Sequence, residues 1–94
     1  MTLGAETQLR LTTHTVARAL EDSVALLDVD SGTYYTIDEV GIIFVEMCGE
    51  GACLGDIARR VASQYEVDEA QALSDLKELA QDLIQEGLAE TFAT

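Results

Sequence analysis

The sequence has few basic residues. Five Lys and Arg stand against 18 Asp and Glu, which gives a formal net charge of -13. A field of this sign repels phosphate backbones, so we expect no nucleic-acid partner. The chain also lacks any run that approaches the ~20 apolar residues needed to cross a bilayer, and residues 1–6 lack the basic start and apolar run of a signal peptide. These absences predict a protein of the cytoplasm with no membrane partner.

Side chains that bind metals or carry out catalysis are also scarce. His14 is the only histidine, and Cys48 and Cys53 are the only cysteines, so a zinc site would have at most three soft ligands scattered along the chain. No serine lies in a Gly-x-Ser-x-Gly motif, and no glycine-rich phosphate loop occurs. We therefore expect no metal, no cofactor and no enzymatic activity.

Two local patterns leave alternatives open. A disulfide between Cys48 and Cys53 would close a small loop, but a reducing cytoplasm favours free, packed thiols. The tripeptide Asp22-Ser23-Val24 is similar to the site at which an acidic carrier protein receives a phosphopantetheine arm. A carrier serine opens a helix, whereas Ser23 leads directly into the apolar run 24–27. A turn that enters a strand is therefore the favoured interpretation.

The first third of the chain predicts three antiparallel strands. Apolar and polar residues alternate with a period of two, and we place strands at residues 8–16, 23–28 and 33–37, with a polar connection over residues 17–22. In the turn 30–32 the last residue is a glycine, which adopts the positive φ that a hairpin requires. The apolar middle strand is typical of a central strand that is covered on both faces.

From residue 38 onward the apolar period becomes helical. Asp38 caps a first helix that ends at Gly49, in the position that a left-handed residue prefers, and a second helix covers residues 54–65. A third helix runs from Asp68 to Gly87, and Gln71 completes a capping box at its start. The first and third helices therefore carry their own start and stop signals.

The order of these elements defines the fold class. We place a further short strand at residues 88–92, after the third helix. The sequence thus predicts an α+β domain in which a three-stranded antiparallel sheet is followed by three helices. With 94 residues the chain has room for one domain, which we bound at residues 8–90, between a flexible N-terminus (1–7) and a C-terminal tail (91–94).

A set of short motifs occurs in a fixed order along the chain. They are Leu27-Asp28, Ser31 to Asp38, Glu39-Val40-Gly41, then Gly51, Leu54, Asp56 and Ile57, followed by Tyr65 to Asp68 and Leu83 to Leu88. This set resembles the PqqD-like family, the precursor-peptide recognition elements of ribosomal-peptide biosynthesis. Three residues depart from the family pattern: Asp38 stands where Asn is common, Phe44 where Trp is common, and Cys53 where a capping Thr or Ser is usual. Only Cys53, a weaker cap, affects the predicted start of a helix.

The resemblance implies a winged-helix-like domain that binds the leader segment of a precursor peptide. The leader adds as a strand to the third strand, in a groove walled by the third helix. The form Gly32-Thr33-Tyr34-Tyr35 and the stand-alone length resemble most the lasso-peptide branch, whose separate recognition protein, of the B1 type, works with a leader peptidase. The implied function is a non-catalytic adaptor whose partners are the leader peptide and that peptidase.

Two other functions are compatible with the same architecture. One is a PqqD-type chaperone that presents a peptide to a radical SAM enzyme. The other, more distant, is a winged-helix DNA regulator, whose recognition helix would have to carry the acidic series of residues 68–86 into a phosphate-lined groove. The charge of the chain argues against the regulator.

The candidate site lies where the third strand meets the third helix. The third strand is the last of the meander, so its outer edge has unpaired amides and carbonyls with which another chain can pair. Alternation along this strand leaves open which of its two tyrosines faces the groove. The apolar stripe of the third helix is wider than the packing of three helices requires, although each of its leucines is as readily a core residue. The predicted peptide-binding residues are Thr33, Tyr34, Tyr35, Thr36, Ile37, Ala72, Asp75, Leu76, Leu79 and Leu83.

The third helix also carries much of the negative charge. Asp75, Glu78 and Asp82 flank its groove-side row and favour leaders with a nearby Lys or Arg. A solvated helix face is the alternative interpretation of the same residues.

Overall fold

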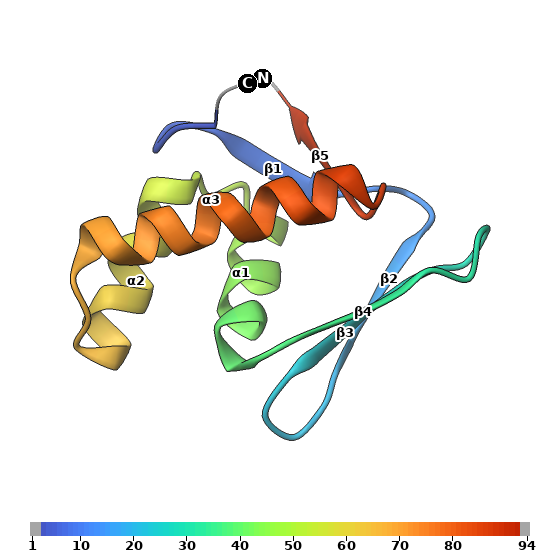
Figure 1. Ribbon diagram of the computed structural model, residues 1–94, viewed down its shortest axis with the longest axis horizontal. Coiled ribbons are helices and arrows are strands. Elements are labelled where there is room, and N and C mark those ends of the chain that lie inside the picture. Colours follow the sequence, from blue (N-terminus) through green and yellow to red (C-terminus); the bar gives the residue numbers. More distant parts are fainter. Residues whose placement is uncertain (1–2, 93–94) are drawn as a thin grey trace.

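The computed structural model describes residues 3–92, which form three helices and two small antiparallel sheets (Figure 1). In chain order the elements are β1 (Gln8–Leu11), β2 (Thr15–Ala19), β3 (Val24–Asp28), β4 (Tyr34–Ile37), α1 (Glu39–Gly49), α2 (Leu54–Tyr65), α3 (Glu69–Gln85) and β5 (Ala89–Phe92). The predicted α+β class is confirmed, and a winged-helix-like description fits it. The three helices lie where the sequence predicts them.

The first predicted strand, over residues 8–16, is wrong because the chain turns at Thr12. There the amide of Thr15 donates a hydrogen bond to the carbonyl of Thr12 (3.0 Å), and the hydroxyl of Thr12 donates to the carbonyl of Gly87 (3.0 Å). β1 therefore leaves the main sheet and pairs with β5, while β2 pairs with β3. The strand predicted at residues 88–92 is confirmed as β5.

The polar connection predicted over residues 17–22 is also wrong. Residues 17–19 belong to β2, and a tight turn joins β2 to β3, in which the amide of Leu20 donates to the carbonyl of Ser23 (2.8 Å). β2 is one of the two outer strands in the order β2-β3-β4. An outer strand keeps one edge in solvent, so polar residues there are compatible with strand pairing.

β3 is the central strand of the main sheet, as predicted. Its inner face supplies Val24 and Leu26 to the core, where they lie in one apolar cluster with Phe44 of α1. On its outer face Ala25 is buried, but Leu27 is 39% exposed. The prediction that this strand is covered on both faces is therefore wrong at Leu27.

Residues 3–7 lie in the segment for which the sequence predicts flexibility, and the structure packs them against the domain. Leu3 is buried in the core. The carbonyls of Ala5 and Thr7 accept hydrogen bonds from the first two amides of α2 (2.8 and 2.9 Å). The N-cap residue Cys53 makes no side-chain hydrogen bond, so the N-terminal segment satisfies helix amides that this weak cap leaves free. At the other end, residues 91 and 92 belong to β5, and residues 93 and 94 lie outside the described residues.

The caps of the two helices that flank the candidate site differ. Asp38 caps α1 as predicted, because its carboxylate accepts a hydrogen bond from the amide of Val40 (3.1 Å). The capping box predicted for α3 is wrong. Asp68 makes no side-chain cap hydrogen bond, and Gln71 donates instead to Asp75 (2.9 Å), one turn further along the helix.

Left-handed glycines lie in the turn between β3 and β4 and in the turn after α1. Gly32 has φ 79° in the turn between β3 and β4, as predicted. After α1 the left-handed residue is Gly51 (φ 81°), whereas Gly49 is the last residue of the helix. The prediction that Gly49 takes this conformation is therefore wrong.

Candidate functional site

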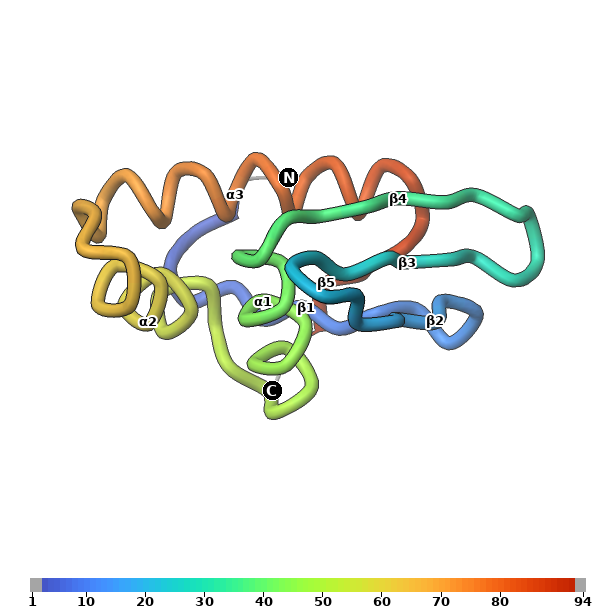
Figure 2. The backbone as a smooth tube through the Cα atoms, turned by 90° about the horizontal axis from the view of Figure 1, so that it is seen from below, coloured from blue at the N-terminus to red at the C-terminus, as the bar shows by residue number. Residues whose placement is uncertain are grey.

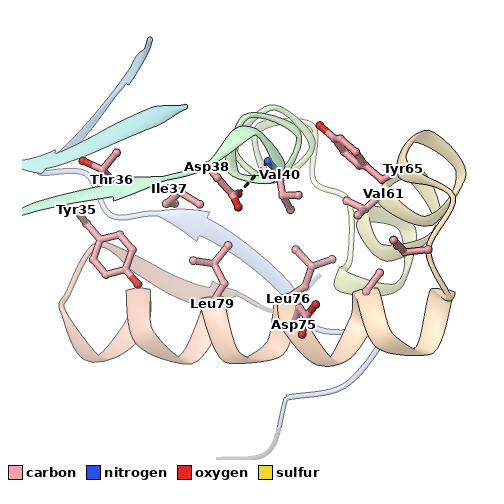
Figure 3. Close-up of a pocket in the computed structure, with 12 residues that line it drawn as sticks. Tyr35, Thr36, Ile37, Asp38, Val40, Val61, Tyr65, Asp75, Leu76 and Leu79 are labelled. Carbon is pink, nitrogen blue, oxygen red and sulfur yellow. Dashed lines mark hydrogen bonds between the residues drawn. The ribbon is translucent and has the colours of Figure 1, made fainter. Parts of the chain in front are cut away.

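A groove of about 470 Å³ lies between β4, the start of α1, the end of α2 and α3 (Figure 3). We call it the β4–α3 groove. Its lining residues are Tyr35, Thr36, Ile37, Asp38, Val40, Val61, Tyr65, Val67, Ala72, Asp75, Leu76 and Leu79. Figure 2 shows α3 running alongside β4, and Figure 3 shows Tyr35, Leu76 and Leu79 pointing into the space between them. The strand and the helix that the sequence predicts to form the binding site are therefore adjacent in the structure.

Most of the predicted site residues line this groove. Those in the lining are Tyr35, Thr36, Ile37, Ala72, Asp75, Leu76 and Leu79. Leu83 does not line it, and its side chain is fully buried in the core. Tyr34 is 63% exposed on the opposite face of the strand, and Thr33 lies in the turn, where its hydroxyl and that of Ser31 hydrogen-bond each other (2.8 Å).

The structure separates the two tyrosines of β4. Burial alternates along the strand, with Tyr34 and Thr36 exposed, Tyr35 half-buried and Ile37 buried. Tyr35 therefore faces the groove. Burial raises the pKa of the Tyr35 hydroxyl, and the carboxylates of Asp82 on α3 and of Glu86, the residue after α3, raise it further.

The outer edge of β4 has no strand partner within residues 3–92, because β4 pairs only with β3. The amide of Asp28 donates to the carbonyl of Thr33 (2.9 Å), so these two opposed residues occupy a hydrogen-bonded position of the ladder. In an antiparallel ladder such pairs alternate with pairs whose amides and carbonyls point away. In the register of β3 with β4, the outward-pointing groups therefore belong to Tyr34 and Thr36.

Five lining residues were not predicted from the sequence. They are Asp38, Val40, Val61, Tyr65 and Val67. They come from the start of α1 and the end of α2, and from the connection between α2 and α3, which the fold closes over one end of the groove. Of these five, Val67 is the residue to which the sequence could have pointed, because it is an apolar residue at a helix connection. In the structure it is 45% exposed. The pKa of Tyr65 is raised by burial and by the carboxylates of Glu39 and Asp38.

The charges of the β4–α3 groove are all negative. Asp38 and Asp75 lie in the lining, and no basic residue does. Asp82 and Glu86 lie close enough to Tyr35 to raise its pKa. A chain that enters this apolar groove therefore meets carboxylates at its rim, which favour a neighbouring cation.

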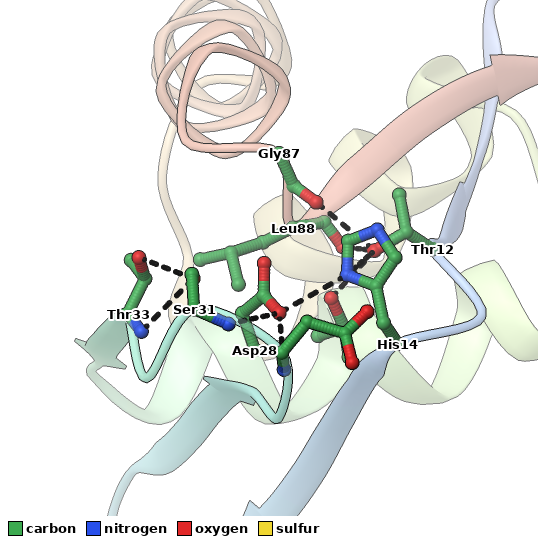
Figure 4. A network of polar contacts seen from close by, with 9 residues as sticks. Thr12, His14, Asp28, Ser31, Thr33, Gly87 and Leu88 are labelled. Atoms are coloured by element: carbon green, nitrogen blue, oxygen red, sulfur yellow. Dashed lines mark hydrogen bonds and ion pairs between the residues drawn. The ribbon is translucent and has the colours of Figure 1, made fainter.

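A separate polar network supports the turn between β3 and β4 (Figure 4). One carboxylate oxygen of Asp28 accepts hydrogen bonds from the amides of Asp30 (2.9 Å) and Ser31 (3.2 Å) and lies 3.3 Å from Nδ1 of His14. Burial alone would raise the pKa of Asp28, but these amides and His14 lower it overall. The side chains of this network lie close enough together to hold a metal ion: they are His14, Asp28 and Asp30. The hydrogen bonds of Asp28, however, stabilise the turn.

The reactive side chains of the described part of the chain do not converge on the groove. Cys48 and Cys53 are free thiols, and burial raises the pKa of Cys48 to about 12. Neither cysteine lines the groove, and neither does His14.

Among the helices of residues 3–92, none is long and apolar enough to cross a membrane.

An open strand edge beside an apolar groove is the arrangement by which peptide-binding domains take up an extended chain as an added strand. The comparisons with known proteins agree with this class. A model of the family "Coenzyme PQQ synthesis protein D (PqqD)" matches residues 23–89, and the chain belongs to this family. No curated protein matches the sequence.

Two solved structures share the fold over nearly their whole length. One is TbiB1 in complex with the TbiA(beta) leader peptide, which is 27% identical, has a TM-score of 0.80, and matches over 90% of this chain and 99% of that one. The other is lasso peptide synthetase B1 complexed with its leader peptide, which is 26% identical, has a TM-score of 0.80, and matches over 88% and 98% of the two chains.

Proposed function

We propose that this chain is a non-catalytic adaptor of the cytoplasm that binds the leader segment of a ribosomally made precursor peptide. It presents the precursor to processing enzymes, above all to the leader peptidase of a lasso-peptide pathway. The observation that carries the proposal is the free edge of β4 beside the apolar β4–α3 groove. The two leader-bound structures of the same fold support it.

In the proposed complex, backbone and side chains have different tasks. The amides and carbonyls of Tyr34 and Thr36 pair with the backbone of the leader, which holds it without regard to sequence. Apolar leader side chains enter the groove against Tyr35, Leu76 and Leu79, and these contacts supply selectivity. The acidic rim favours leaders that carry a Lys or Arg near the apolar anchors.

The energies favour a specific and reversible complex. Each backbone pair contributes about 0.5–1.5 kcal/mol net, and each apolar anchor contributes roughly 1.5–3 kcal/mol. Ordering the leader costs about 2–5 kcal/mol. Three such anchors, with the four outward backbone groups of Tyr34 and Thr36, therefore outweigh the cost of ordering the leader.

The proposal is tested by titrating a fluorescein-labelled leader peptide, taken from a precursor identified in the gene neighbourhood of this chain, and following its anisotropy. We expect saturable binding of the leader. We expect no binding of the core peptide, the part of the precursor that follows the leader. Leu79→Ala should weaken binding by about tenfold or more, because it removes an apolar wall of the groove. Leu73→Ala is the matched control, since Leu73 is also a half-buried leucine of α3 but does not line the groove.

Two results would contradict the proposal. The first is a leader that fails to bind, or a core peptide that binds equally well. The second is an equal effect of the two leucine variants, which would place the leader elsewhere. Stimulation of a radical SAM enzyme on the same precursor, without any effect on a peptidase, would instead favour the alternative function, a PqqD-type peptide chaperone.

A further inference from the structure

The outer face of the main sheet carries a row of exposed apolar side chains. Val16 of β2 lies opposite Leu27 of β3, which lies opposite Tyr34 of β4. These three neighbours are 52%, 39% and 63% exposed, and Val29, just beyond the end of β3, is 58% exposed. A contiguous apolar row across three strands is typical of an interaction surface, whereas single exposed apolar residues need no explanation.

The same face carries no carboxylate on any of its three strands. Alternation places on it the row itself together with Arg18, Ala25 and Thr36. The chain as a whole has 18 acidic residues, so this face differs from the rest of the surface. Depletion of charge with retention of aromatic and arginine side chains is the composition of the centre of a protein interface.

The position of the row indicates what binds there. Tyr34 belongs to the strand whose free edge accepts the leader in the proposed function, and a leader added to β4 extends this same face by one strand. A protein seated on the row therefore touches the bound leader as well. A second copy of the chain is disfavoured because each copy has a net charge of -13.

We infer that the outer face formed by Val16, Leu27 and Tyr34 is the docking surface for the enzyme that processes the leader-bound precursor. This inference rests on the proposed function. The partner is a protein with an apolar contact surface and basic residues at its rim, opposite Glu21 and Asp22 of the exposed β2–β3 turn. The adaptor then binds leader and enzyme on adjoining surfaces, the leader at the edge of β4 and the enzyme on the face of the sheet.

The test compares two double variants in direct binding to an immobilised leader peptidase identified in the gene neighbourhood of this chain. V16T/L27T makes the row polar while keeping side chains that suit strands. V16I/L27M is the matched control, because it changes the same positions and keeps them apolar. We expect V16T/L27T to bind the peptidase about tenfold more weakly or worse and to lose a similar factor in stimulated leader removal. The control should bind like the unchanged chain, and all three proteins should bind the leader with equal affinity.

Peptidase binding by V16T/L27T that equals that of the unchanged chain would overturn the inference. So would a dimer of the unchanged chain that this variant dissociates in sedimentation, because the face would then belong to a second copy. If V16T/L27T does not fold, Val16→Lys replaces it, since lysine is well tolerated on an edge strand. A leader that fails to bind the unchanged chain contradicts the proposed function alone, because direct peptidase binding is measured without leader.

Discussion

At the scale of single residues, the adjacent tyrosines of β4 have different tasks. The side chain of Tyr35 lines the groove, whereas Tyr34 is exposed on the opposite face and offers its backbone to the free edge. The sequence left this assignment open. The available signal was Ile37, the most apolar residue of the strand, which is buried and shares its face with Tyr35. Which tyrosine faces the groove could therefore be predicted only after deciding which side of the strand meets the core.

This difference predicts unequal effects of two alanine substitutions. Tyr35→Ala should weaken leader binding by about tenfold or more, because it removes a large wall of the groove. Tyr34→Ala should cause a much smaller loss, because the backbone groups at that position remain. Anisotropy titrations of both variants with the labelled leader measure the difference, and a larger loss for Tyr34→Ala would show that the assignment of the two faces is reversed.

At the scale of elements, the sequence predicts the helices better than the strands. α1, α2 and α3 each have a local apolar period, so their positions follow from neighbouring residues. The end of β1 depends on its partner β5, which lies at the other end of the chain. The continuous alternation over residues 8–16 therefore does not reveal the turn at Thr12. Local periodicity cannot show where a strand leaves one sheet for another.

The candidate site shows the same limit. The residues contributed by β4 and α3 were predictable, because strand alternation and a helical stripe point to them. Val61, Tyr65 and Val67 were not predicted, because they reach the groove only through the packing of α2 against α3. Leu83 continues the apolar stripe of α3 but lies outside the groove, whereas Leu76, which is equally buried, lines it. The wall of a groove and the core beneath it have the same apolar pattern in sequence.

The contact between α1 and the groove strand gives a prediction about stability. Gly41 of α1 packs against Ile37 of β4, and a Cβ atom at this position would also lie 3.0 Å from the side chain of Val24. Gly41→Ala should therefore lower the free energy of unfolding by about 1–3 kcal/mol, because it overpacks this contact. Gly49→Ala is the matched control, since no atom lies within 4 Å of its added Cβ, and it should leave stability unchanged or raise it by up to about 1 kcal/mol. Urea denaturation measures both, and equal stability of the two variants would contradict the close packing.

At the scale of the whole molecule, the fold keeps one strand edge free and builds a groove beside it. β1 and β5 pair with each other away from the main sheet, and the N-terminal segment packs on α2. Neither therefore covers the outer edge of β4. The net charge of -13 disfavours a phosphate-bearing ligand. The arrangement leaves an extended, apolar and preferably basic peptide as the ligand that fits best.

The addition of the leader to the edge of β4 is tested most directly by amide hydrogen exchange, read residue by residue by NMR with and without saturating leader. The account predicts that the amides of Tyr34 and Thr36 become protected on leader binding, because they gain hydrogen bonds from the added strand. The amides of Tyr35 and Ile37 face β3 and serve as internal controls that change little. Unchanged exchange at Tyr34 and Thr36 when the leader is fully bound would contradict strand addition at this edge.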